Sequence, residues 1–223
     1  MILKEDILKV KGYLKGSESS VLSKYEKVSI NSLEVRSGNI FFALKGETND
    51  GHKYILDVIK RKAGLIFVNT NWYNKNKEKY RKNIFFVVKD TTLALAELAH
   101  FYKKRMNIPI IGIAGSNGKT STKDIISEVL SKKFNVIKTE GNYNNHIGLP
   151  LTLLNIKDKH DFCVAEFGSN HFKELDFLCK IAEPDFGLVT NIGKEHLEYF
   201  KNLKGVAKEE CTLYDYVNKN GSL

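Results

Sequence analysis

Residues 108–124 read IPIIGIAGSNGKTSTKD, an apolar run followed directly by a glycine-rich turn and a Gly-Lys-Thr triplet. The apolar run predicts a buried β-strand, and the glycines allow the sharp turn into a following helix. A lysine and a hydroxyl at such a turn are typical of a phosphate-binding loop, in which backbone N–H groups hold the anion. The common loop has a longer spacing before its Gly-Lys pair. A tight turn with a solvent-facing lysine would show the same triplet, so both interpretations stay open.

Strand-like and helix-like segments alternate on both sides of this loop. Apolar runs of strand length are predicted as strands at 39–44, 63–68, 83–88, 108–114, 135–139, 162–168 and 186–193. Helices are predicted at 53–62, 90–105, 122–133, 171–182 and 203–217, with Asp90 or Thr91 as a candidate N-cap. The order predicts an α/β protein, with a small α/β domain over residues 1–106 and a mostly parallel sheet of P-loop type over residues 107–223.

Polar motifs follow the predicted strands of the second domain, where ligands bind in parallel sheets. Glu166 ends the strand in VAEFGSN and is placed to complete an Mg²⁺ shell, although a partly exposed strand-end glutamate is the commoner case. His196 follows the next strand, and its chemistry favours a structural or hydrogen-bonding role over binding of a hard cation. The loop GNYNNHIGLP (141–150) offers amides for phosphate or substrate, or is a turn built from asparagines.

The composition disfavours several classes of protein for this sequence, among them nucleic-acid-binding, disulfide-rich secreted and membrane-spanning proteins. The chain has 223 residues and a net charge of +9, but its lysines are spread along the sequence, and we expect no nucleic-acid partner. Cys163, Cys179 and Cys211 have neither a paired pattern nor metal-ligand spacing, which favours a reducing compartment. No apolar run approaches the roughly 20 residues that span a bilayer, and the N-terminus lacks a signal-peptide core. We therefore expect a soluble, cytoplasmic protein without membrane insertion.

Taken together, the motifs resemble the Mur ligases of peptidoglycan synthesis. The resemblance rests on GSNGKTSTKD (115–124), GNYNNHIGLPLTLL (141–154), AEFGSNHFKELDFLCKIAEPD (165–185) and TNIGKEHLEYF (190–200). Upstream, NSLEVRSGNIFFALKGETNDGHKYI (31–55) is similar to the family's N-terminal domain, which holds the UDP end of the substrate. The match covers essentially the whole chain. The details favour the members that add D-alanyl-D-alanine.

This resemblance implies an activity. The family's ligases use ATP and Mg²⁺ to activate a carboxylate as an acyl phosphate, which an amine then attacks. Here the implied substrates are UDP-N-acetylmuramoyl-tripeptide and D-alanyl-D-alanine, and the implied state is a monomer. Activation by phosphoryl transfer needs charge neutralisation and positioning, which agrees with a phosphate loop and a carboxylate at one sheet edge.

The resemblance also assigns roles to residues. ATP-binding positions are Gly115, Ser116, Asn117, Gly118, Lys119, Thr120, Ser121 and Asn191. Substrate-binding positions are Ser32, Asn144 and Asn145. Metal-binding positions are Thr120, Glu166, His196 and Glu210, and catalytic positions are Lys119, Asn145 and His196.

The chain departs from the family pattern in three ways. Leu33 stands where an arginine is expected near the UDP group, and Glu210 stands where a carbamylated lysine is expected near the second Mg²⁺. Either Glu210 replaces the carbamate with some shift or the second metal site is lost, and we expect weakened metal binding. The remainder of the central domain and the C-terminal ligase domain are missing from the 223 residues, so we expect this chain alone to be weakly active or inactive. The alternative is a non-catalytic nucleotide-binding module of the same family. A related amide ligase such as folylpolyglutamate synthase is disfavoured by the UDP-type N-terminal segment.

Overall fold

The computed structural model describes residues 1–16 and 21–220. The chain divides into two compact units, Met1–Tyr102 and Lys103–Leu223. The division falls inside helix α4 (Thr91–Met106), four residues before the boundary predicted from the sequence. The assignment of the two parts as UDP-binding and ATP-binding domains stays a prediction.

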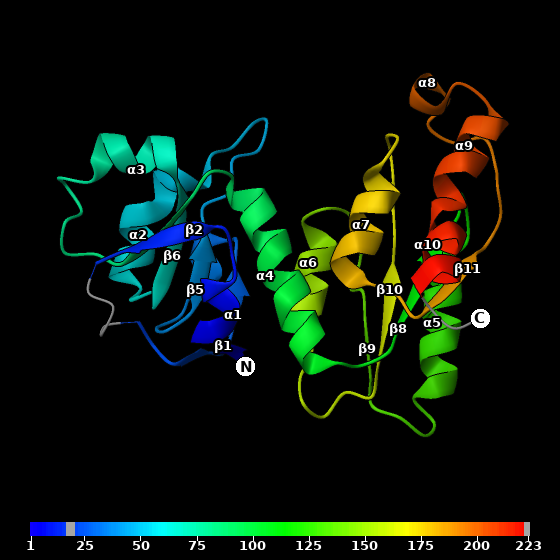
Figure 1. Cartoon of the computed structure of the whole chain (residues 1–223), viewed down its shortest axis with the longest axis horizontal. Coiled ribbons are helices and arrows are strands. Elements are labelled where there is room, and N and C mark those ends of the chain that lie inside the picture. Colours follow the sequence, from blue (N-terminus) through cyan, green and yellow to red (C-terminus); the bar gives the residue numbers. More distant parts are fainter. Residues whose placement is uncertain (17–20, 221–223) are drawn as a thin grey trace. The chain divides into compact units, whose positions relative to one another are not determined.

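The first unit is built on a five-stranded sheet (Figure 1). Its strands, in spatial order, are β2 (Gly12–Lys15), β7 (Phe85–Val88), β6 (Leu65–Asn69), β5 (Ile40–Phe42) and β4 (Val28–Ser29). All neighbours are parallel except β2, which runs antiparallel to β7. A separate antiparallel pair joins β1 (Ile2–Leu3) and β3 (Lys24–Tyr25). The helical segments are α1 (Lys4–Leu8), η2 (Ser32–Glu34), η3 (Gly51–Tyr54), α2 (Ile55–Lys60) and α3 (Thr70–Asn76).

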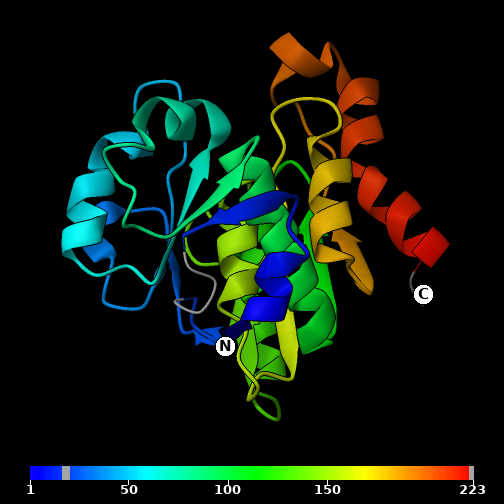
Figure 2. The ribbon, with the colours of Figure 1, turned by 60° about the vertical axis from the view of Figure 1, so that its left-hand side comes forward.

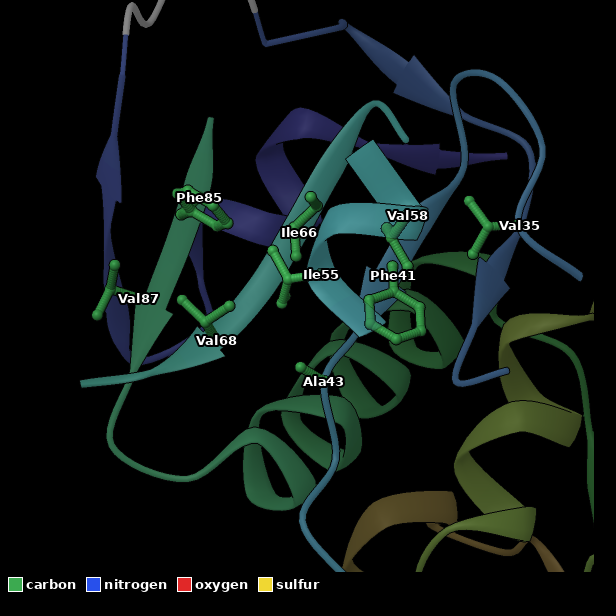
Figure 3. Packing of buried hydrophobic residues seen from close by; sticks show 9 residues of the cluster. All are labelled: Val35, Phe41, Ala43, Ile55, Val58, Ile66, Val68, Phe85 and Val87. Carbon is green, nitrogen blue, oxygen red and sulfur yellow. The ribbon is translucent and has the colours of Figure 1, made fainter. Parts of the chain in front are cut away.

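Both faces of this sheet are covered, which explains its uninterrupted apolar strands. On one face, alternate strand residues pack against α2 and the segments beside it (Figure 3). The labelled residues of this cluster are Val35, Phe41, Ala43, Ile55, Val58, Ile66, Val68, Phe85 and Val87. On the other face the rings of Phe42, Phe67 and Phe86 form a row, with centroids 4.0 and 4.8 Å apart.

Helix α4 begins as the sequence predicts. The Oδ1 atom of Asp90 accepts hydrogen bonds from the N–H groups of Thr92 (2.8 Å) and Leu93 (3.1 Å). The hydroxyl of Thr91 donates to the carbonyl of Ala43 (2.9 Å). Asp90 is therefore the cap, while Thr91 ties the helix to the end of β5.

The second unit contains a parallel sheet of four strands. In spatial order these are β11 (Phe186–Val189), β8 (Ile110–Ala114), β10 (Phe162–Glu166) and β9 (Val136–Lys138). The helices are α5 (Lys119–Leu130), α6 (Gly148–Leu154), α7 (Glu174–Ala182), α8 (Leu197–Phe200), α9 (Leu203–Glu210) and α10 (Thr212–Asn220). Helix α5 lies on one side of β8, β9 and β10, with α6 and α7 on the other (Figure 1).

The strand order reverses at β8. The chain continues from β8 to β9 and β10 on one side and then crosses to β11 on the other. In open parallel sheets this reversal creates a crevice beyond the carboxyl ends of the strands, where ligands bind. The glycine-rich loop follows β8 directly, so the topology places it at this crevice.

Several predicted bounds were wrong. Helix α7 begins at Glu174 rather than 171, and strand β10 ends at Glu166 rather than 168. Helix α5 begins at Lys119 rather than 122, because its first turn is polar and shows no apolar periodicity. Strand β11 ends at Val189, where the chain turns to bond with the glycine-rich loop. The helix predicted at 203–217 is two helices, since α9 closes at Cys211, whose N–H bonds back to Ala207 (Figure 2).

Among the described residues, no helix combines the length and the apolar character that crossing a bilayer requires.

The three cysteines differ in burial, which predicts their reactivity. Cys163 and Cys179 are fully buried, and this burial raises the pKa of each thiol to about 12. Cys211 is half-buried. Because the thiolate is the reactive form, iodoacetamide should label native protein at Cys211 and reach the other two only after unfolding in urea. Mass spectrometry of tryptic peptides measures this, with Cys211→Ser as the control; rapid native labelling of Cys163 would contradict the packing.

Candidate functional site

The glycine-rich loop needs glycine at two positions for two different reasons. Gly115 has φ of +115°, and a Cβ there would lie 2.3 Å from Oγ1 of Thr190. Gly118 has φ of +78° and open space around it. It is the residue before Lys119, where α5 starts, and the first turn of a helix leaves its backbone N–H groups without partners inside the helix. Helix N-termini of this kind bind anions in other proteins, and anion binding at this loop stays a prediction.

The segment after β11 holds the loop in place. The side chain of Asn191 contacts Asn117 at both ends: Oδ1 accepts from the Asn117 N–H (3.1 Å), and Nδ2 donates to the Asn117 carbonyl (3.2 Å). The carbonyl of Asn191 accepts from the N–H of Ser116 (3.0 Å), whose hydroxyl accepts from the N–H of Gly193 (2.8 Å). Asn191 therefore supports the loop, and a direct contact with nucleotide stays a prediction.

Lys119 is folded back over the loop. Its ammonium donates a hydrogen bond to the carbonyl of Gly115, and the side chain is half-buried. Thr120 and Ser121 follow it in the first turn of α5 and are exposed. The Lys119 side chain is long enough to reach a phosphate group bound at the helix N-terminus. Its ammonium would then exchange the carbonyl of Gly115 for an anionic oxygen as hydrogen-bond partner.

Three segments meet at the carboxylate of Glu166. Its Oε2 accepts from the hydroxyl of Thr120 (2.9 Å), and its Oε1 accepts from Nδ2 of Asn144 (2.9 Å). Glu166 is only 3% exposed, and its own N–H donates to Oγ1 of Thr139 (3.0 Å). The structure thus brings together three residues that the sequence places in separate motifs. The carboxylate is held by neutral donors rather than by a cation.

Asn145, the neighbour of Asn144, has a different partner set. Its Oδ1 accepts from the N–H groups of Ile147 (3.0 Å) and Gly148 (2.9 Å), which open helix α6. The side chain is exposed and holds a turn in this structure. Its predicted role toward substrate stays a prediction.

Glu210 reaches the loop from α9. Its side chain is 1% exposed, Oε2 accepts from the N–H of Gly115, and Oε1 accepts from the hydroxyl of Ser169 (3.1 Å). Burial raises the pKa of this carboxyl above its usual range and Glu195 adds to the rise, while the bond from Gly115 and the charge of Lys119 oppose it. Glu210 therefore joins the ends of β8 and β10 to α9.

His196 is not part of this cluster. It is exposed at the start of α8 with φ of +44°, and its ring faces Phe200 at 6.4 Å between centroids. In residues 1–16 and 21–220, no three His, Cys, Asp or Glu side chains converge closely enough to hold a metal ion. Glu166, His196 and Glu210 therefore do not form one ligand set here, and their shared role in metal binding stays a prediction.

The oxygen donors nevertheless suit Mg²⁺. The Thr120 hydroxyl and the Glu166 carboxylate are hard donors beside an anion-binding loop. In the described structure Oε1 of Glu195 is buried and lacks a hydrogen-bond partner, and the charge of this carboxylate acts on Glu210. A buried carboxylate oxygen without a partner next to a phosphate loop is what a cation would stabilise.

In the first unit, Ser32 lies at the start of η2 and is nearly buried. Asn31 caps this segment by accepting from the N–H of Leu33 (3.0 Å). Leu33 itself is 74% exposed, an unusual place for a large apolar side chain. The predicted role of Ser32 toward substrate stays a prediction.

Sequence reasoning missed Thr139, Ser169, Thr190 and Glu195, all of which support the site. Each lies just beyond the end of a strand or in the loop that follows it. That position is a signal, because carboxyl ends of parallel strands meet at one edge.

The raised pKa of Glu210 predicts a pH-dependent stability difference. The fold favours the neutral acid, so the contribution of this group is fully present below the ordinary carboxyl pKa and is lost as pH rises through the raised value. Glu210→Gln is neutral at every pH and keeps an oxygen for the Gly115 N–H. We expect its free energy of unfolding to exceed that of wild type near pH 8 and to converge with it near about pH 4. Urea unfolding in EDTA measures this, and a variant that is less stable near pH 8 would contradict it.

Comparison with known proteins follows the same division of the chain. A model of the Mur ligase middle domain matches residues 113–223, and a model described as the Mur ligase family, catalytic domain, matches residues 24–103. The chain is 36% identical over 200 residues to a UDP-N-acetylmuramoyl-tripeptide–D-alanyl-D-alanine ligase of Haemophilus influenzae, covering 88% of this chain and 42% of that protein. The Escherichia coli ligase of the same name is 33% identical over 210 residues, covering 94% and 44%.

Solved structures agree with these matches. MurF from Acinetobacter baumannii superposes with a TM-score of 0.84 at 27% identity, covering 99% of this chain and 46% of that chain. MurF ligase from Thermotoga maritima, solved in complex with ADP, superposes with a TM-score of 0.76 at 30% identity, covering 92% and 45%. The chain thus spans less than half the length of the relatives that it matches. With both of its units matched by models of one family, the chain belongs to the Mur ligase family.

Proposed function

We propose that this chain binds ATP with Mg²⁺ at the loop after β8, as part of a ligase reaction. That reaction joins D-alanyl-D-alanine to UDP-N-acetylmuramoyl-tripeptide through an acyl phosphate. The observation that carries the proposal is the meeting of Thr120, Glu166 and Asn144 beside the open N-terminus of α5. The names of the relatives and the ADP complex of one of them support it.

The chain's own residues suit phosphoryl transfer. The N–H groups at the start of α5 and the ammonium of Lys119 bind and orient anionic oxygens. Bound Mg²⁺ supplies charge neutralisation, and the Thr120 hydroxyl and the Glu166 carboxylate would hold it. Asn144 fixes the orientation of that carboxylate through its Oε1. Such a site acts by positioning and electrostatics, which is what activating a carboxylate requires.

We propose that the UDP end of the substrate binds the first unit, near Ser32. Leu33 is exposed and carries no positive charge, so neighbouring groups would have to bind the diphosphate. We also propose a monomer in the cytoplasm, which three free cysteines support. The second candidate function, a non-catalytic nucleotide-binding module, predicts ATP binding without turnover.

Lys119→Ala should weaken binding of Mg·ATP by about tenfold or more, because it removes a charge-assisted hydrogen bond to phosphate. Isothermal titration calorimetry measures this. Lys132→Ala is the matched control, since Lys132 is exposed and pairs only with exposed Glu128 among the contacts described. Equal affinity of Lys119→Ala and wild type would contradict the assignment of the loop.

A phosphate-release assay separates the two candidate functions. With UDP-N-acetylmuramoyl-tripeptide and D-alanyl-D-alanine present, we expect slow ATP-dependent release that stops when the UDP-linked substrate is omitted. ATP binding without release under any of these conditions supports the non-catalytic module. Absence of ATP binding to wild type overturns both.

A further inference from the structure

Helix α5 buries two polar side chains and leaves two apolar side chains exposed. It buries Lys123 (3% exposed) and Ser127 (4%), while Ile125 and Val129 are each 65% exposed. Hydrophobic burial alone would turn the apolar residues inward, since each costs about 1.5–3 kcal/mol to leave in water. Places where a local rule fails in this way are expected at functional sites. The inward face of α5 therefore carries buried polar residues beside the half-buried Ile126 and Leu130.

Lys123 is the most buried residue of α5. It lies three residues after Thr120 on the helix, so both side chains occupy the face directed at β10 and β9. Its ammonium donates a hydrogen bond to the carbonyl of Thr139 (2.9 Å), which is completely buried. Lysine is almost never buried to this extent unless it has partners.

Thr139 links Lys123 to Glu166, the candidate metal ligand. Its N–H donates to the carbonyl of Val164 (3.1 Å), and its Oγ1 accepts from the N–H of Glu166 (3.0 Å). The peptide of Thr139 is thus held between Lys123 on α5 and strand β10. A continuous chain of contacts runs from the Lys123 ammonium to the backbone of Glu166, whose carboxylate accepts from Thr120.

An ion pair alone does not account for the buried ammonium. The closest carboxylate atom described, Oδ1 of Asp124, is 3.6 Å from Nζ of Lys123 and belongs to a half-exposed side chain. The same atom is held more closely by Lys138 (2.7 Å), whose hydrogen bond lowers the pKa of Asp124. The direct hydrogen bond to the Thr139 carbonyl is the shorter and more buried contact of Lys123.

We propose that Lys123 is a positioning residue for the magnesium-binding pair Thr120 and Glu166, acting through Thr139. The inference rests on the proposed function for its metal and extends it to a residue that contacts neither metal nor nucleotide. Lys123 holds the chain after β9 against α5. This contact keeps the end of β10 in register with the first turn of the helix, so the two oxygen ligands face one site.

The first test separates metal-dependent from metal-independent binding of ATP. In Lys123→Met, calorimetry should show the affinity for Mg·ATP falling by about tenfold, while the affinity for ATP in EDTA changes by about twofold or less. A purely structural role would weaken both equally. Lys138→Met is the matched control, since it removes a cation from Asp124 without touching the Thr139 carbonyl, and it should leave both affinities close to wild type.

The threonine provides a second route if Lys123→Met fails to fold. Thr139→Val removes the acceptor for the Glu166 N–H, and Thr139→Ser keeps it. The valine variant should reproduce the selective loss of Mg·ATP affinity, and the serine variant should retain affinity within about twofold. Because both residues act along one chain of contacts, Lys123→Met with Thr139→Val should be little worse than either change alone.

Amide hydrogen exchange tests the inference without ATP. The Glu166 N–H should exchange about tenfold faster in Lys123→Met, because its acceptor is no longer held. The Phe167 N–H, which donates to the carbonyl of Ile113 (2.8 Å), should be unchanged and serves as the internal control.

The outcomes are distinct. Equal losses of Mg·ATP and ATP affinity, or unchanged exchange at Glu166, overturn the positioning role. Wild type that binds no ATP overturns the proposed function, and the exchange measurement then decides by itself whether Lys123 controls Glu166.

Discussion

The buried carboxylate of Glu166 is the constraint around which the second unit is arranged. The carboxylate of Glu166, at 3% exposure, accepts one hydrogen bond from α5 and one from the loop before α6, while the backbone N–H of Glu166 donates to the chain after β9. Those bonds fix the distance and rotation of three segments relative to the end of β10. The start of α5 belongs to this arrangement, because Thr120 in its first turn donates to the carboxylate.

A second set of contacts makes the loop rigid before any ligand binds. The chain after β11 forms hydrogen bonds with the backbone of Ser116 and Asn117. Glu210 on α9 accepts a hydrogen bond from the N–H of Gly115. A preorganised loop does not have to be ordered on binding, which leaves more of the interaction energy for the ligand. The same contacts bring a buried carboxylate close to the place that an anion would occupy. A cation beside Glu195 and Glu210 would balance that charge.

Much of the fold was predictable because its signals are local. The predicted strands β5 to β11 are short apolar runs, and their parallel pairing follows from alternation with helices. Strands β1 to β4 were missed because they are only two to four residues long and mostly carry no apolar run. Asp90 caps α4 as its residue type predicts. The start of α5 was missed because Lys119 and Thr120 are polar, and the break at Cys211 was missed because α9 and α10 carry one continuous helical pattern.

By itself, the sequence determined the α/β class, the glycine loop and the presence of residue types that suit phosphate and Mg²⁺, because glycine, lysine and carboxylate have local chemical meanings. Only the tertiary structure decided which of these residues meet. Glu166 and Asn144 joined Thr120, whereas His196 stayed apart at an exposed turn. From helical periodicity alone, Lys123 would be interpreted as a solvent-exposed lysine, because the pattern does not show how the helix is rotated. The hydrogen bonds of Thr120 and Lys123 to distant segments depend on packing in three dimensions rather than on spacing along the chain.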